Sequence, residues 1–244
     1  MGCAALCAGS ADCLAQAAAS PISTLKALGH DRYQIGKIIV DKAAHRLVVP
    51  AEVAHLGEAP LEYVAVTKDG LKAYETLLEA GATGSEMNLA LILLGFDSAN
   101  SSHLAFQFDR NLPSGQTATV RIRWRSSQGV REVSADEALL SDEQLRTLPP
   151  AIWVYLGSFI NPPDGRFGAD TAGTLIGFVH DPHCLIEHRL GLGIGAYGSV
   201  RGNAANLPPI GSPVEIIVTA TGQRAEPAPP PPPGQAPGAP PASP

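Results

Sequence analysis

This sequence is poor in charged and aromatic residues, and its charge balance excludes one broad class of protein. Of its 244 residues, 16% are charged and 5% are aromatic, and the formal net charge is −6. Nucleic-acid binding depends on a basic surface that neutralises phosphates, so nucleic acid is not an expected partner. No apolar run approaches the roughly 20 residues that a membrane-spanning helix needs, so we expect no transmembrane segment.

The few cysteines are unevenly distributed and have no recognised metal-binding spacing. Cys3, Cys7 and Cys13 lie close together in the first segment, and Cys184 stands alone in the body of the chain. Their C-x3-C-x5-C spacing matches neither zinc-binding pairs nor iron–sulfur runs. We therefore expect no cofactor.

Residues 1–20 resemble part of an export signal. They are mostly small and apolar and include Ala15-Gln16-Ala17, which has the A-x-A pattern of a cleavage site. Two features are unusual for an export signal: Asp12 lies inside the apolar stretch, and no Lys or Arg precedes the stretch. A truncated start that lacks the basic region upstream would explain both. The sequence therefore predicts a periplasmic or otherwise extracytoplasmic protein.

Short apolar segments predict a mainly antiparallel β-structure over residues 21–224. Strands are expected at residues 35–41, 46–53, 61–66, 71–78, 117–125, 130–133 and 214–219, with 71–78 returning antiparallel to 61–66. In the clearest of them, Val120, Ile122 and Trp124 point to one face and three arginines to the other. The expected class is α+β, either a sandwich or a partly closed barrel.

One long buried helix is predicted before residue 95. Thr83 and Glu86 form a capping box, and Gly95 is placed to end the helix. Because the residues on every side of it are apolar, we expect burial on all sides; they are Met87, Leu89, Ala90, Leu91, Ile92, Leu93 and Leu94. A short helix is also expected to begin at Ser134.

The end of the chain has a composition that cannot form a packed core. From residue 225 to 244 it consists mostly of proline, alanine and glycine, with an unbroken proline run at 229–233. We expect a disordered tail there.

The stretch from Trp153 to Pro182 carries the predicted binding surface. It is interpreted as a β-hairpin with strands at 153–159 and 175–179, joined by a polar loop longer than a hairpin requires. Loops on a rigid sheet commonly carry function. The expected ligand-binding residues are Trp153, Tyr155, Ser158, Asn161 and Asp170, together with Glu75.

A second candidate site follows directly. Several metal-ligating residue types occur within nine residues, and the candidate ligands are His180, His183, Cys184 and His188. Imidazole and thiolate groups can hold zinc or copper. The spacing belongs to no standard set, however, so an ordinary polar loop with Pro182 in its turn is the alternative.

Three further patterns have both a functional and a structural interpretation. The ridge of arginines at 121–125 could grip an anion, or be a solvated strand face. Residues 193–198 match a dinucleotide-binding fingerprint, but no helix is expected after them, which favours a loop. Ser158, His180 and Asp170 could form a catalytic set, or Ser158 could simply allow close packing.

Several short blocks, taken together, carry a family resemblance. They are Leu61-Glu62-Tyr63, Tyr74–Leu78, Ala90–Gly95, Trp153–Ser158, Ala169-Asp170, Gly173, Asp181-Pro182 and Leu207–Val214. This combination resembles the YdjY-type domain family, whose bacterial members are often exported and have no established activity. The resemblance implies one domain plus a tail, and export, but no reaction.

The chain departs from the family in two respects. The family pattern has His-Glu where this chain has Tyr74-Glu75. Some relatives are described as ferredoxin-like, and this is not expected here because no cysteine run can hold an iron–sulfur cluster.

These observations favour a non-catalytic extracytoplasmic module that binds a small molecule or an envelope protein through the 157–170 loop. The competing interpretation is a metal-assisted hydrolase that uses His180, His183 and Cys184. A third is an envelope-associated structural protein with the proline-rich tail as a spacer.

Overall fold

The computed structural model describes residues 25–102, 111–141, 146–147, 152–189 and 199–226. The predicted export segment, the fingerprint at residues 193–198 and the tail beyond residue 226 therefore lie outside the described residues.

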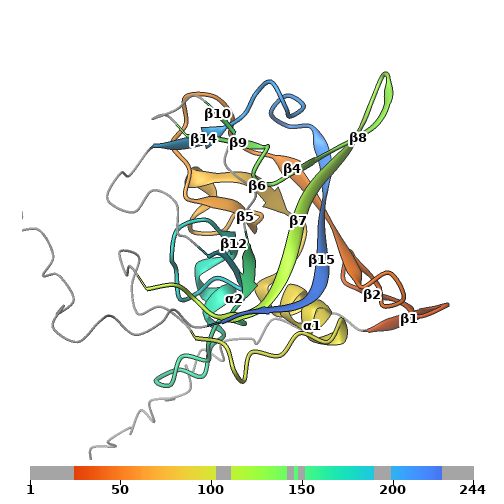
Figure 1. The fold of residues 1–244 in the computed structure, drawn as a ribbon, viewed down its shortest axis with the longest axis vertical. Helices are drawn as coiled ribbons and strands as arrows, with labels where there is room; N and C mark the ends of the chain where they lie inside the picture. The colour runs from red at the N-terminus through yellow and green to blue at the C-terminus, as the bar shows by residue number, and fades with distance from the viewer. Residues whose placement is uncertain (1–24, 103–110, 142–145, 148–151, 190–198, 227–244) are drawn as a thin grey trace, which may run out of the picture.

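The centre of the fold is a closed β-barrel (Figure 1). Around it the strand order is β4 (Arg46–Val53), β15 (Pro213–Ala225), β7 (Gly115–Ser126), β11 (Trp153–Tyr155), β13 (Ile186–His188), β12 (Thr174–Gly177), β5 (Tyr63–Thr67) and β6 (Thr76–Ala80). Pairing of β6 with β4, where Ala80 lies opposite Ala51, closes the ring of eight strands. The β-rich class expected from the sequence is confirmed, in the form of a barrel.

The alternating strand 117–125 shows how the interior is built. Val120, Ile122 and Trp124 of β7 are buried as predicted, and Ile216 and Val218 of the neighbouring β15 join them in the core. Burying a side chain of this size is worth about 1.5–3 kcal/mol relative to leaving it exposed. The period-two pattern therefore identifies the face of the strand that points inward.

Further strands extend from the barrel. β3 (Ile38–Asp41), β2 (Arg32–Ile35) and β1 (Lys26–Gly29) continue the sheet beyond β4 and project to one side, whereas β8 (Gly129–Ser134) pairs with the outer part of β7 (Figure 1). A small second sheet contains β10 (Arg146–Thr147), β9 (Leu139–Ser141) and β14 (Val200–Gly202). The single strand predicted at residues 35–41 is divided because Gly36 has a positive φ of 55° and turns the chain.

Two strand pairings predicted from the sequence are wrong. After the 3₁₀ turn η1 (Ala73–Glu75), β6 lies parallel to β5 instead of antiparallel. The predicted hairpin of β11 and β12 is also absent, because β13 lies between them, antiparallel to β11 and parallel to β12. A connection long enough to include a helix, α2 (Gly168–Ala172), does not oblige the strands on either side to pair.

Helix α1 (Gly84–Leu93) begins as predicted but is buried on one face only. Thr83 Oγ1 accepts the Glu86 backbone N–H at 3.2 Å, and the Glu86 carboxylate accepts the Thr83 N–H at 3.0 Å. Ile92 is 50% exposed, so the prediction of burial on all sides is wrong. The helix packs on β2, β3, β12 and α2, which leaves its other face in solvent.

The helix predicted to begin at Ser134 is a turn between β8 and β9. Its capping bonds do form, because Ser134 Oγ accepts the Glu137 N–H at 3.2 Å and the Glu137 carboxylate accepts the Ser134 N–H at 2.7 Å. The chain then enters β9 at Leu139. Local capping chemistry therefore starts a turn without committing the chain to a helix.

Candidate functional site

A hydrogen-bonded cluster of ionisable residues lies in the connection between β12 and β13. Because these neighbouring strands are parallel, residues 178–185 must run back along the sheet before β13 begins. This connection contributes His180, Asp181 and His183, β13 contributes Glu187, and Tyr63 comes from β5. We call these five residues the histidine–carboxylate cluster.

Glu187 is the buried centre of this cluster. Its side chain is 1% exposed, and Oε2 lies 3.0 Å from His180 Nδ1 while Oε1 accepts the Asp181 backbone N–H at 2.7 Å. Burial raises the pKa of the Glu187 carboxyl, and the hydrogen bond from His180 opposes this effect. Glu187 therefore fixes the backbone at Asp181.

The Asp181 carboxylate links the buried part of the cluster to the surface. Oδ1 accepts the His183 backbone N–H at 2.9 Å and lies 2.8 Å from His183 Nδ1, and Oδ2 accepts the Tyr63 hydroxyl at 3.1 Å. Burial raises the pKa of Tyr63, which keeps its hydroxyl a donor. The side chain of His183 is 39% exposed. The imidazole is thus held at its Nδ1 edge, and the rest of the ring is left at the surface.

An aromatic ring lies against this imidazole, and a basic side chain lies over the Tyr63 ring of the same cluster. The Phe159 ring lies 5.1 Å from the His183 ring, centroid to centroid. Lys72 Nζ lies 5.9 Å from the centroid of the Tyr63 ring, whose hydroxyl binds Asp181, and 5.6 Å from the centroid of the Tyr74 ring. Tyr74 is 63% exposed and Phe159 36% exposed. We call Lys72, Tyr74, Phe159 and His183 the His183 surface.

Glu75 lies behind this surface. It is 2% exposed, and its Oε1 lies 2.5 Å from Lys72 Nζ. Glu75 therefore holds the Lys72 ammonium rather than facing a ligand itself. Tyr74, at the position where the family pattern has a histidine, is the neighbour that points outward.

The two aromatic residues predicted to bind ligand belong to the barrel interior. Trp153 and Tyr155 are each 1% exposed. The Trp153 ring meets the His188 ring edge to face at 5.3 Å, and the Tyr155 hydroxyl donates to Asn88 Oδ1 of α1 at 2.6 Å. Both side chains are therefore part of the core and not of an exposed patch.

Asp170 and Asn161, from the predicted binding loop, make bonds within the protein. The Asp170 carboxylate accepts the backbone N–H of Ser85 at 2.8 Å and also its hydroxyl, so it caps the N-terminal turn of α1. Asn161 Nδ2 donates to Asp164 Oδ1 at 2.8 Å inside its own loop.

Ser158 is not joined to the catalytic set considered from the sequence. It is 8% exposed with φ of 57°, and its Oγ has no hydrogen-bond partner among the described residues. Asp170 is bonded to Ser85 and His180 to Glu187. Among the described residues no hydrogen bond connects the three, so the geometry gives no support to a Ser–His–Asp arrangement.

The four predicted metal ligands do not converge. Cys184 is fully buried, and burial raises the pKa of its thiol, which disfavours the thiolate that a metal needs. His188 lies in the barrel wall with its ring against Trp153, and burial, with a smaller effect of His180, lowers its pKa to about 4. Within the described ranges, no three His, Cys, Asp or Glu side chains are grouped so that they could share a metal ion.

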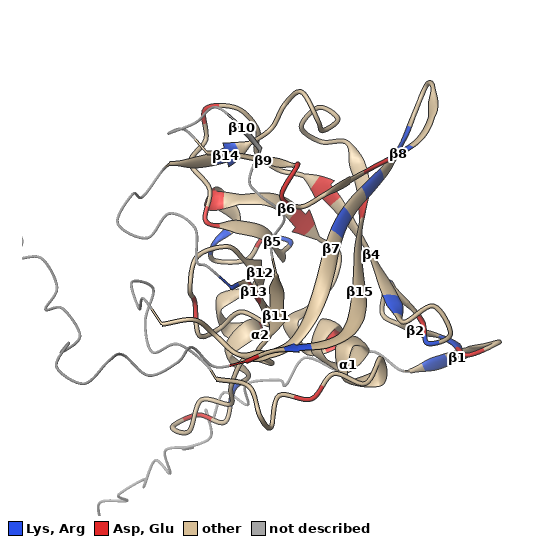
Figure 2. Cartoon of the chain, in the orientation of Figure 1, with Lys and Arg blue, Asp and Glu red and all other residues tan. Residues whose placement is uncertain are grey.

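The arginine ridge lies on β7, which carries blue segments in Figure 2, and two of its arginines pair with carboxylates of neighbouring strands. Arg121 pairs with Glu132 of β8, and Arg123 Nε lies 2.8 Å from Glu215 Oε2 of β15. Exposed pairs of this kind are worth about 0–1 kcal/mol each. The ridge therefore fits a solvated strand face better than a binding site for anions.

Sequence analysis identified the region of the cluster, including Glu187, but did not predict the bond of Glu187 to His180 or the contribution of Tyr63. The density of histidines drew attention to residues 180–188, and the seven-residue spacing of His180 and Glu187 gives no sign of their contact. Tyr63 lies 118 residues from Asp181 in sequence. Only the pairing of β5 with β12 brings them together.

The fold and site define a closed eight-stranded β-barrel with a polar, histidine-containing cluster built into one connection of its wall. The model of the YdjY domain matches residues 38–219, and the chain belongs to this family. No curated protein and no solved structure matches the chain. In the described part, no helix has the length and apolar character needed to cross a bilayer.

Proposed function

We propose that this protein is a non-catalytic extracytoplasmic module that captures an envelope protein through the His183 surface. The observation that carries the proposal is the Tyr63–Asp181–His183 chain of hydrogen bonds, which holds an imidazole at the surface against the ring of Phe159. The 157–170 loop contributes to this surface through Phe159.

The composition of the His183 surface favours a protein partner. Aromatic side chains are enriched where protein interfaces concentrate their binding energy, and Tyr74 and Phe159 are both exposed. Leu71, next to Lys72 in sequence, and Ile160, next to Phe159, are 72% and 59% exposed. Side chains that are already fixed lose less entropy on association, and Asp181 and Glu75 fix His183 and Lys72 in this way.

Site-specific photo-crosslinking in intact producing cells tests this proposal. A photoreactive phenylalanine analogue at Tyr74 or Phe159 should give the same discrete adduct, and a second substitution, His183→Ala, should weaken both. The same analogue at Val130, which is 61% exposed on β8, is the control and should give none. Equal adducts from all three positions, or none from Tyr74 and Phe159, would refute the proposal.

The location is tested separately. In fractionated cells, we expect the mature protein outside the cytoplasm with its N-terminus after Ala17. An intact N-terminus in the cytoplasmic fraction would contradict the extracytoplasmic role and the envelope partner, and only protein binding by the His183 surface would remain for the crosslinking to test.

The second candidate is an enzyme, and one observation favours it. Asp181 holds His183 by Nδ1, which is how a carboxylate orients an imidazole that acts as a general base. For the metal-assisted version, elemental analysis of untagged protein decides. Stoichiometric metal that is lost on His183→Ala would favour the hydrolase over the binding module.

A further inference from the structure

A β-bulge opens a space between the last strand and the end of α1. On β15 the register with β7 shifts between Ala220 and Arg224, which lie opposite Ala118 and Gln116. Two extra residues are therefore accommodated on β15, and Gly222 has a positive φ of 72° there. The regular pairing of β15 with β7 is therefore interrupted between Ala220 and Arg224.

Hydrogen bonds hold the bulge open. Thr221 Oγ1 donates to the Thr117 backbone carbonyl at 3.1 Å and accepts the Gln223 N–H at 3.1 Å, and the two threonine hydroxyls also contact each other. A wall that satisfies its own polar groups in this way is preformed, and a ligand would not have to organise it.

The opposite wall is the C-terminal end of α1. Gly95 ends the helix with φ of 97°, and Phe96 then turns inward, its ring 5.2 Å from that of Tyr155. Gln116 joins this wall to β7, because its Oε1 accepts the Asp97 N–H at 2.6 Å and its Nε2 donates to the Gly95 carbonyl at 3.3 Å. The two walls are therefore fixed relative to each other.

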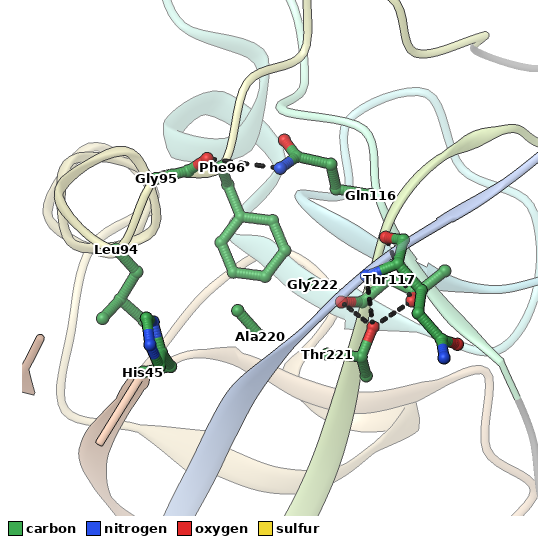
Figure 3. Close-up of a pocket in the computed structure, with 10 residues that line it drawn as sticks. His45, Leu94, Gly95, Phe96, Gln116, Thr117, Ala220, Thr221 and Gly222 are labelled. Atoms are coloured by element: carbon green, nitrogen blue, oxygen red, sulfur yellow. Dashed lines mark hydrogen bonds between the residues drawn. The ribbon is translucent and has the colours of Figure 1, made fainter. Parts of the chain in front are cut away.

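Between the walls lies a cavity of about 290 Å³ (Figure 3). Leu94, Phe96 and Ala220 form its apolar part, and His45 and Thr221 stand at its sides. The volume is at the small end of the range for ligand pockets. No Lys, Arg, Asp or Glu is among the described residues that line it.

From this lining we propose that the cavity binds a small uncharged ring compound rich in hydroxyl groups, of which a monosaccharide is the simplest case. A charged ligand would leave water without an opposite charge to receive it. The apolar part matches the C–H face of a sugar ring, and the His45 imidazole and the second N–H of the Gln116 amide can form hydrogen bonds with its hydroxyls. This site is separate from the His183 surface and does not depend on that proposal.

The probe is D-glucose, titrated into isotope-labelled full-length protein and followed through the backbone amide signals. We expect saturable shifts at Gly95 and Gly222, with D-glucuronate and D-glucosamine binding at least about tenfold more weakly because they carry charge. His45→Ala should weaken glucose binding about fivefold through the loss of one hydrogen bond. Ala220→Leu should fill the cavity and abolish binding while the other amide signals stay dispersed.

His30→Ala is the matched control, because His30 and His45 are both in turns with positive φ, at 52° and 50°, and His30 does not line the cavity. It should bind glucose as the wild-type protein does. The proposal is overturned if no saturable shift occurs at these glycines, if His45→Ala binds glucose as tightly as His30→Ala, or if the charged sugars bind as tightly as glucose.

Discussion

At the scale of single residues, β13 places two titratable side chains on opposite faces of the same strand. Successive side chains of a strand alternate, so Glu187 meets His180 while His188 meets Trp153 on the other face. Burial favours the neutral form of both side chains, which moves their pKa values in opposite directions. It raises the pKa of the Glu187 carboxyl and lowers that of the His188 imidazole to about 4.

His188 should make the protein less stable in mild acid. Its folded-state pKa of about 4 lies below its ordinary value of 6.5, so the unfolded chain takes up a proton first as the pH falls. The free energy of unfolding should therefore drop between pH 6.5 and about 4, by about 3 kcal/mol from this residue. Urea unfolding at a series of pH values measures the drop.

His188→Gln removes the titrating group, and the wild-type protein minus this variant isolates its effect. The subtraction is needed because the raised pKa of Glu187 acts in the opposite direction, adding stability as the pH falls. His30→Gln, in the exposed turn between β1 and β2, should keep the wild-type profile. Identical pH profiles for wild type and His188→Gln would show that the buried imidazole does not carry the effect.

At the scale of secondary-structure elements, the N-terminus of α1 is capped both by residues at its own start and by a residue that is distant in sequence. Thr83 and Glu86 supply a local capping box, and Asp170 of α2 binds the N–H and hydroxyl of Ser85. Exposed N–H groups at the start of a helix favour a nearby carboxylate. The contact between α1 and α2 is therefore electrostatic as well as steric.

Asp170→Ala should lower stability without affecting binding. We expect a loss of about 1 kcal/mol in the free energy of unfolding, the usual cost of removing a helix cap, and unchanged crosslinking from Tyr74. Asp164→Ala is the control in the same connection, since Asp164 bonds only to Asn161 and Arg166 among the described contacts. If Asp170→Ala kept wild-type stability but lost the crosslink, Asp170 would be a binding residue after all.

At the scale of the whole molecule, the barrel depends on its last strand up to its final residues. β15 pairs with β4 on one side and with β7 on the other, and its last pair joins Ala225 to Gly115. The predicted tail boundary at residue 225 is therefore slightly early, because Ala225 is buried in this strand.

Truncation after Glu226 should leave the melting temperature unchanged, since the described strand pairs all lie before that point. Truncation after Ala220 should lower it, because the pairs of Arg224 and Ala225 with β7 are lost. The melting temperatures of the two truncated proteins are compared by thermal unfolding monitored with circular dichroism. Equal melting temperatures for the two truncations would mean that the end of β15 contributes nothing to the barrel.

The sequence by itself determined several of the strands, among them β4, β5, β7, β8 and β15, and the buried face of β7, but it did not predict β13. The alternation of β7 and the capping box of α1 are local patterns, each encoded within about ten residues. The family resemblance was also carried by such short blocks, and the match over residues 38–219 confirms it. Apolar periodicity and helix capping depend on residues a few positions apart in the chain, and they can therefore be predicted from the sequence alone.

Only the tertiary structure decided the order of the strands, and with it the site. The insertion of β13 between β11 and β12 and the parallel pairing of β5 with β6 join segments far apart in sequence. These pairings bring Tyr63 to Asp181, leave His183 at the surface and place Trp153 in the core. The physical reason is that many strand orders satisfy the same pattern of buried faces, and the choice among them rests on packing across the whole barrel.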